Sequence, residues 1–234
     1  MNKKYKFIDL FAGIGGFHQA LGDLDLECVF ASEIDPHARV TYRINHKIND
    51  ELFNENIRDI DPKDIPEHDI LCAGFPCQPF SQAGHKRGFS DTEGTDRGNL
   101  FFCIKDILKA KRPRGYILEN VRHLLKHDDG KTFQIICDEL RSIGYSVEYK
   151  VLKASGFGIP QHRPRIFIVG FDEKAMNKSM PYLWPKERPL KMNMSDILGG
   201  ECDREIGFTL RVGGRGSGID DRRNWDAYRV NGEV

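Results

Sequence analysis

The sequence has 234 residues, of which 39% are hydrophobic and 30% are charged, a composition that is typical of globular domains and excludes disordered and membrane-spanning chains. Its 35 Lys and Arg residues balance 35 Asp and Glu residues, so the net charge gives no sign of a nucleic-acid partner and any basic surface must be local. Six scattered cysteines without a C-x-x-C pair, and an N-terminal segment without a signal-peptide pattern, predict a reduced, cytoplasmic protein.

The N-terminal stretch has the pattern of a strand, a glycine turn and a helix. Residues Tyr5–Leu10 are apolar and rich in strand-forming side chains, and the turn Phe11–Phe17 then leads into a helix that ends near Gly22. Such a turn brings backbone amides close to a ligand. The spacing is not G-x-G-x-x-G, so a pyrophosphate ligand is not indicated, and a purely structural turn is an equally good interpretation.

A second strand, Glu27–Ser32, is followed by Glu33, which is placed to accept hydrogen bonds from ribose hydroxyls. Asp35 and the proline after it predict the start of the next helix. We interpret Ile57–Ile60 as the end of a third strand. Asp59 can meet an adenine amino group there, or it can be an exposed loop acid.

The apolar run Asp69–Ala73 predicts a short buried strand that breaks at Gly74 into a loop. Pro76 stops the hydrogen bonding of the strand, and Pro79 stiffens the exit. Cys77 is therefore expected at the carboxyl end of a strand, where open α/β sheets place ligands and reacting groups. The alternative is a small buried cysteine that only packs.

The polar, glycine-punctuated segment Ser81–Gly98 is either disordered or a lid that closes over a substrate. A helix over Asn99–Lys111 and a fifth strand over Gly115–Val121 follow. Parallel strands separated by helices put Glu119 and Cys77 at the same edge of the sheet. Glu119 is expected to be a protonated, partly buried acid, although a loop carboxylate bonded to nearby amides is the alternative.

A helix over Lys131–Ile143 precedes two strands, Ser146–Leu152 and Arg165–Phe171, whose short connector lets them pair antiparallel. Arg163 and Arg165 flank a proline at the end of this connector, so both side chains leave an extended backbone on one face. The pair can clamp anionic or carbonyl-like groups, or it can be a solvated charge pair.

After Phe171 the prolines and Trp184 indicate a linker, and the segment Phe208–Arg223 is rich in glycine and arginine. Flexible arginine-bearing loops suit a DNA groove or phosphates, although a turn-rich β segment is a comparable interpretation. The eight histidines show no metal-ligand spacing.

Four stretches occur in the same order as in the cytosine-C5 DNA methyltransferases: Phe7–Phe17, Gly74–Gln78, Glu119–Val121 and Gln161–Arg165. The chain therefore resembles that family. The resemblance implies a Rossmann-like α/β fold with a mostly parallel sheet and an antiparallel edge strand. It also implies S-adenosyl-L-methionine (AdoMet) as cofactor, double-stranded DNA as substrate, no metal and no membrane, and a role in a bacterial modification system. Residues 1–171 would form the catalytic domain and residues 172–234 a linker and the start of a target-recognition region.

The resemblance also assigns roles to single residues. The catalytic residues would be Cys77, as the nucleophile, with Glu119, Arg163 and Arg165. Those around the cofactor would be Phe11, Gly13, Gly15, Gly16, Glu33, Ile34, Asp59, Ile60, Gly74, Pro76 and Leu100. Those contacting DNA would be Ser81, Arg87, Arg97, Gln161, Arg211 and Arg215.

The family pattern usually continues through a complete recognition region and a returning segment, whereas this sequence stops at Val234. We therefore expect a fragment, or one half of a split enzyme with a complementing C-terminal chain. Two alternatives to DNA methylation stay open: methylation of tRNA cytosine by the same constellation, and a non-catalytic chain that binds AdoMet or DNA.

Overall fold

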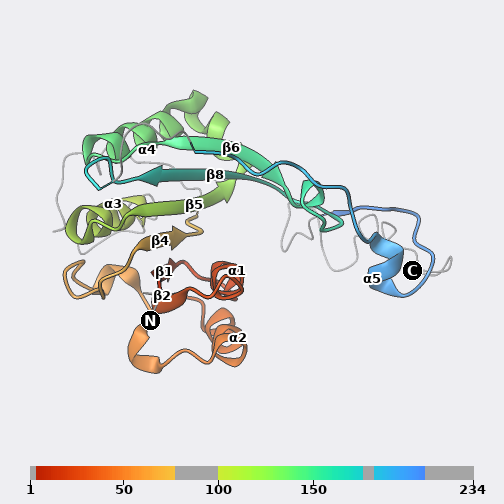
Figure 1. Cartoon of the computed structure of the whole chain (residues 1–234), viewed down its shortest axis with the longest axis horizontal. Coiled ribbons are helices and arrows are strands. Elements are labelled where there is room, and N and C mark those ends of the chain that lie inside the picture. The colour runs from red at the N-terminus through yellow and green to blue at the C-terminus, as the bar shows by residue number, and fades with distance from the viewer. Residues whose placement is uncertain (1–3, 77–99, 176–181, 209–234) are drawn as a thin grey trace. The chain divides into compact units, whose positions relative to one another are not determined.

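The structure is a computed structural model that describes residues 4–76, 100–175 and 182–208 (Figure 1). Its centre is a seven-stranded sheet, in which the strands β1, β2, β3, β4 and β5 pair parallel to one another. The arrow of β8 runs opposite to that of β5 (Figure 1), so the predicted α/β fold with a mostly parallel sheet is confirmed. In spatial order the strands are β3 (Phe53–Asn54), β2 (Glu27–Ser32), β1 (Lys6–Leu10), β4 (Ile70–Ala73), β5 (Gly115–Val121), β8 (Pro164–Phe171) and β6 (Glu148–Lys153).

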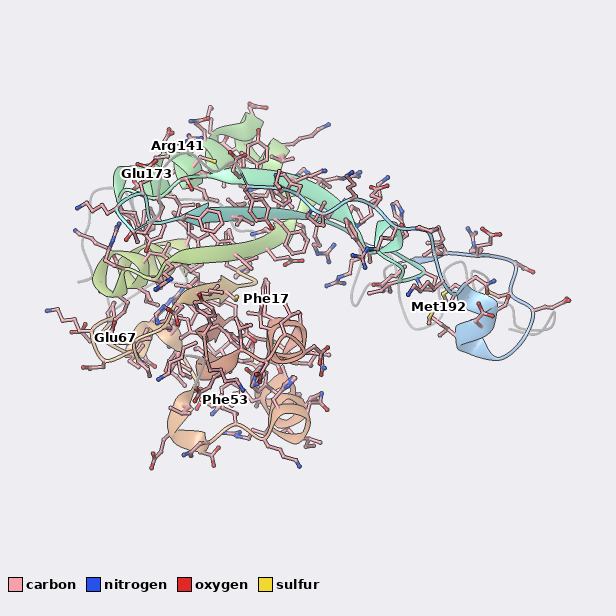
Figure 2. The ribbon with its side chains drawn as sticks, viewed as in Figure 1. Phe17, Phe53, Glu67, Arg141, Glu173 and Met192 are labelled. Carbon is pink, nitrogen blue, oxygen red and sulfur yellow. The ribbon has the colours of Figure 1, made fainter. Side chains whose placement is uncertain are left out.

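The middle strands are apolar runs because they are covered on both faces. In β1, Phe7, Ile8 and Leu10 are fully buried. Phe7 forms a core cluster with Leu21 and Cys72, and Phe17, labelled in Figure 2, packs against this cluster. These contacts attach the first helix to the sheet immediately after the glycine turn.

Among the described residues that carry the sheet, four α-helices and several 3₁₀ segments connect the strands. Helix α2 begins as predicted, with Asp35 accepting hydrogen bonds from the backbone amides of His37 and Ala38 at 2.8 and 2.9 Å. The α-helices are α1 (Gly16–Gly22), α2 (Pro36–His46), α3 (Leu100–Lys111) and α4 (Lys131–Ser142). The 3₁₀ segments are η1 (Asp50–Leu52), η2 (Ile57–Asp59), η4 (Arg122–Gly130) and η5 (Ala154–Gly156).

One predicted strand is wrong. Residues Ile57–Asp59 form the 3₁₀ helix η2, and the third strand is the earlier dipeptide Phe53–Asn54. The side chain of Asn56 accepts a hydrogen bond from the amide of Arg58, which gives the backbone a local partner in place of a neighbouring strand.

The chain divides into two compact units, residues 1–150 with 166–182, and residues 151–165 with 183–234. In the second unit β7 (Gln161–His162) pairs parallel with β9 (Gly207–Phe208), and the short helix α5 (Met194–Leu198) starts with a reciprocal cap between Asn193 and Asp196. Across the described residues, no helix is both long and apolar enough to cross a bilayer.

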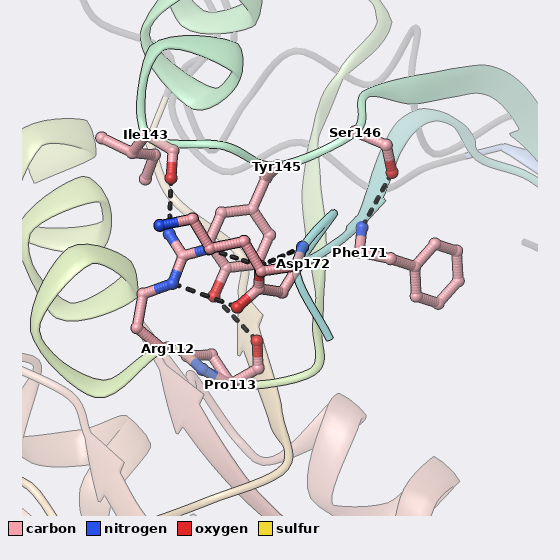
Figure 3. Close-up of polar contacts among 8 residues, drawn as sticks. Arg112, Pro113, Ile143, Tyr145, Ser146, Phe171 and Asp172 are labelled. Atoms are coloured by element: carbon pink, nitrogen blue, oxygen red, sulfur yellow. Dashed lines mark hydrogen bonds and ion pairs between the residues drawn. The ribbon is translucent and has the colours of Figure 1, made fainter. Parts of the chain in front are cut away.

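A polar network at the amino end of β5 connects α3, α4 and β8 (Figure 3). The guanidinium of Arg112 forms an ion pair with Asp172, donates to the carbonyl of Ile143, and lies 4.7 Å from the ring centroid of Tyr145. The hydroxyl of Tyr145 donates to the carbonyl of Pro113 at 2.7 Å. Asp172 is only 4% exposed, so this network provides a buried carboxylate with its counter-charge.

Candidate active site

The register of the parallel strands places the predicted site residues along one edge of the sheet. Leu10 pairs with Ser32 on one side and with Ala73 on the other, and Ala73 pairs with Leu118. The residues that come next on these four strands therefore form a row at the carboxyl edge: Glu33, Phe11, Gly74 and Glu119. Open α/β sheets bind ligands at this edge.

The glycine turn after β1 adopts a left-handed backbone at three positions, with φ angles of 54° at Phe11, 56° at Gly13 and 93° at Gly15. A side chain tolerates this region poorly, so Phe11 stores strain of about 1 kcal/mol. Glu33 fixes the turn, because one carboxylate oxygen accepts from the amide of Gly13 at 2.7 Å and the other from the amide of Asp35 at 2.8 Å. The end of β2 thus clamps the turn to the start of α2.

The end of β5 lies against the loop that follows β4. A Cβ placed on Gly74 would lie 3.8 Å from Oε2 of Glu119 and 3.7 Å from the carbonyl oxygen of Phe11. Asn120, which is 2% exposed, donates its side-chain amide to the carbonyl of Phe75 at 2.9 Å, and its Oδ1 accepts from its neighbour's amide at 2.8 Å. The half-buried Glu119 is therefore held beside the loop that leads to position 77.

Open space and apolar surface adjoin the glycine turn. A Cβ on Gly13 or on Gly16 would have no atom of the described residues within 4 Å. Ile14 and Ile34 are 62% and 66% exposed although they are apolar. This rim therefore combines carboxylate oxygens, open space beside the backbone and exposed apolar side chains. The combination suits a ligand that has both hydroxyls and a flat ring.

Burial makes four of the described cysteines poor nucleophiles. It raises the pKa of Cys28 to about 12, raises the pKa of both Cys103 and Cys137 to about 11, and raises the pKa of the fully buried Cys72 well above its usual value. A thiolate is the reactive form of cysteine, so these four thiols are suited to packing rather than to covalent chemistry.

The remaining predicted residues divide between the two units and the undescribed ranges. Asp59 is exposed at the end of η2, Ile60 follows it half-buried, and Leu100 is the first residue of α3. In the second unit are Gln161 in β7, Arg163 directly after it and Arg165 in β8. Pro76 is the last described residue before the first internal gap, and the residues that lie outside the described ranges are Cys77, Ser81, Arg87, Arg97, Arg211 and Arg215.

Three polar aromatic residues behind the glycine turn were not expected from the sequence. Nδ1 of His18 lies 2.7 Å from the hydroxyl of Tyr42, and the rings of His18 and His46 stack with centroids 4.2 Å apart. Tyr42 and His46 are four residues apart and so share one face of α2, which was the one signal available in the sequence.

The family model for C-5 cytosine-specific DNA methylases matches residues 5–210. The chain belongs to this family. It is 50% identical over 205 residues to the type II methyltransferase M.NlaX of Neisseria lactamica, covering 86% of this chain and 62% of the relative. It is 52% identical over 196 residues to M.HaeII of Haemophilus aegyptius, covering 84% of this chain and 58% of the relative. The chain thus spans about three fifths of the length of these relatives.

Solved structures share the fold. A DNMT2 structure from Spodoptera frugiperda superposes with a TM-score of 0.65 at 23% identity, covering 83% of this chain and 59% of that one. A prophage-encoded DNA modification methyltransferase from Escherichia coli, described as putative in its own report, gives a TM-score of 0.63 at 23% identity, covering 90% of this chain and 62% of that one. The Rossmann-like methyltransferase fold is therefore confirmed. The comparisons give no support to a complementing chain.

Membership of a methyltransferase family implies the use of AdoMet, and the rim beside the glycine turn fits this molecule. Glu33 offers carboxylate oxygens for ribose hydroxyls, Ile34 an exposed apolar surface for an adenine ring, and Gly13 unobstructed backbone. Within the described part of the chain, no cluster of His, Cys, Asp or Glu is arranged to hold a metal ion.

Proposed function

We propose that this chain carries the catalytic part of a DNA (cytosine-5-)-methyltransferase of a type II modification system. The observation that carries the proposal is the position of Glu119 and Asn120 against Gly74 and Phe75. It brings the Glu-Asn-Val segment of β5 against the residues that precede Cys77 in the sequence, although Cys77 and Glu119 are 42 positions apart. Family membership and relatives that are type II methyltransferases favour DNA over tRNA as the substrate.

Cys77 would be the nucleophile. Its thiolate would form a bond to C6 of cytosine, which makes C5 electron-rich enough to accept a methyl group. Glu119, protonated and hydrogen-bonded to N3 of the base, would neutralise the charge that develops on the ring. Loss of the C5 proton and departure of the Cys77 thiolate would then restore the aromatic ring. Because C6 is hidden in stacked DNA, the target cytosine would be flipped out of the helix.

AdoMet, when bound, would supply an electrophilic methyl group on its sulfonium. Glu33 would accept from the ribose hydroxyls, since the two hydrogen bonds it makes here leave acceptor capacity on both oxygens. Ile34 would cover one face of the adenine, with Asp59 and Ile60 beside its amino group. Other groups lining this site would be Phe11, Gly13, Gly15, Gly16, Gly74, Pro76 and Leu100.

Positive charge would favour the Cys77 thiolate and hold the nucleic acid. Arg163 and Arg165 would supply it near the reacting base. The contacts to DNA would come from Ser81, Arg87, Arg97, Gln161, Arg211 and Arg215. Direct phosphate contacts of this kind make affinity fall as the salt concentration rises.

The test is covalent capture on duplex DNA, and in parallel on tRNA, in which the target cytosine is replaced by 5-fluorocytosine. Fluorine cannot leave as a proton does, so the adduct persists, and we expect a shifted band with the wild-type chain and AdoMet. Cys77→Ser should give no band yet still bind cofactor, whereas the control Cys202→Ser should behave as wild type. Adducts that form on tRNA but not on DNA would show that the substrate is RNA. An adduct formed by Cys77→Ser would refute the assignment of Cys77 as the nucleophile.

A further inference from the structure

The glycine turn is held at two points, one just before helix α2 and one at the end of this helix. Near its first residue, Glu33 binds the amide of Gly13. At its last residue, Nε2 of His46 lies 3.3 Å from the carbonyl oxygen of Ile14. A carbonyl can only accept, so His46 must present a protonated Nε2. Two adjacent residues of the turn are therefore fixed: Gly13 through its amide donor, by Glu33 directly after β2, and Ile14 through its carbonyl acceptor, by His46 at the end of α2.

The imidazole of His46 is in van der Waals contact with the turn as well as hydrogen-bonded to it. A Cβ on Gly15 would lie 2.1 Å from Nε2 and 2.4 Å from Cδ2 of His46, distances that no side chain could keep. Gly15 is thus needed for its φ of 93° and also because the ring occupies the space of a side chain. The contact leaves the turn little freedom on this side.

A second layer fixes the His46 ring. His18 stacks on it at 4.2 Å with an angle of 12° between the ring planes, and the ring of Tyr42 lies edge-on at 4.8 Å. The fully buried Tyr42 holds His18 through the 2.7 Å contact of its hydroxyl. Beneath them lies the carboxyl of Asp9, which is fully buried, and this burial raises its pKa well above the usual range.

We propose that His46 is a positioning residue for the AdoMet-binding turn: from the end of α2 its imidazole holds the Ile14 carbonyl, and the stacked His18 and Tyr42 hold the imidazole. The role rests on the proposed cofactor site, but the contact itself belongs to the ligand-free protein. The His46 contact lies at Ile14 and Gly15, in the part of the turn that faces the helix. Gly13 belongs to the part of the turn that would face the cofactor.

The first experiment needs no cofactor. Hydrogen–deuterium exchange of the ligand-free chain should show faster exchange in the peptide spanning residues 11–16 for His46→Ala than for wild type. His37→Ala is the matched control, because it removes an exposed imidazole from the same helix and should leave that peptide unchanged. Equal exchange in His46→Ala and wild type, with the fold intact by circular dichroism, would overturn the proposal.

The second experiment measures binding of S-adenosyl-L-homocysteine by calorimetry. Loss of one neutral hydrogen bond should weaken binding by His46→Ala about three- to tenfold. His46→Gln, whose amide N–H can still donate to the carbonyl, should recover most of that loss, and His37→Ala should bind as wild type. If His46→Gln is as weak as His46→Ala while both unfold at the same temperature, the hydrogen bond has no positioning role.

The two experiments separate the two proposals. A wild-type chain that binds no S-adenosyl-L-homocysteine would count against the proposed function, while the exchange comparison would still decide whether His46 holds the turn. A His46→Ala chain that exchanges and binds like wild type would refute the positioning role and leave the proposed function intact.

Discussion

Replacing Asn120 by Asp tests whether β5 holds the loop that precedes Cys77. The substitution keeps the size of the side chain and the acceptor for its neighbour's amide, but it removes the N–H that donates to the Phe75 carbonyl at 2.9 Å. At neutral pH the new carboxyl either stays ionised, with an oxygen facing that carbonyl at a position only 2% exposed, or must take up a proton to restore the donor, and both outcomes cost stability. A buried group left without its partner costs about 1–3 kcal/mol.

For a chain of this size that cost should lower the melting temperature by roughly 2–12 °C, since about 2–4 °C corresponds to each kcal/mol. The assay is thermal unfolding at pH 7, together with single-turnover methyl transfer, which should slow at least as strongly because the loop carries the nucleophile. Asn45→Asp on the exposed face of α2 is the control and should change the melting temperature by far less. Wild-type stability in the Asn120→Asp chain would refute the hydrogen-bonded link.

The other predictions concern stability. Arg112→Met should lower the free energy of unfolding by about 1–3 kcal/mol, because Asp172 loses its counter-charge while Arg112 itself is partly exposed. Burial raises the pKa of Asp172, but the amide of Lys174 and the guanidinium of Arg112 more than offset it and hold the pKa below its ordinary value. The difference in the free energy of unfolding between wild type and Arg112→Met, measured by urea unfolding, should therefore have its full value above about pH 4 and shrink as the pH falls further. An unchanged difference at pH 3 would contradict this pairing. Gly170→Ala should unfold the chain or cost more than about 3 kcal/mol, since its Cβ would lie 1.9 Å from the Ser146 carbonyl oxygen, whereas Gly16→Ala meets no atom within 4 Å and should be tolerated.

The sheet could be predicted because its strands are distinct apolar runs. Strands β2 and β5 have the predicted bounds, and Asp35 caps α2 as its sequence context indicated. Parallel pairing then brings Glu119 to the same edge as the loop after β4, a consequence of topology rather than of side-chain detail. The part of the site that depends on strand order was therefore accessible from the sequence.

Contacts that depend on packing were not accessible. The strand expected at Ile57–Ile60 is a 3₁₀ turn because the side chain of Asn56 satisfies the backbone locally. In η4, Asp128 and Asp129 take positive φ angles of 49° and 52°, although neither residue is a glycine. The pairing of β7 with β9 joins segments about 45 residues apart in sequence, and each is only two residues long.

The order of the strands sets the distance between two carboxylates at the edge of the sheet. Neighbouring strands lie about 4.8 Å apart, so Glu33 directly after β2 and Glu119 on β5, with β1 and β4 between them, are separated by about 14 Å across the sheet. If one carboxylate binds the ribose of the cofactor and the other binds the target pyrimidine, the spacing of the hydrogen-bonded strands sets the distance between the methyl donor and the methyl acceptor. An inserted residue in β4 would turn the side chains of this strand to the opposite face, whereas the number of strands between the two carboxylates, and so their separation, would stay the same.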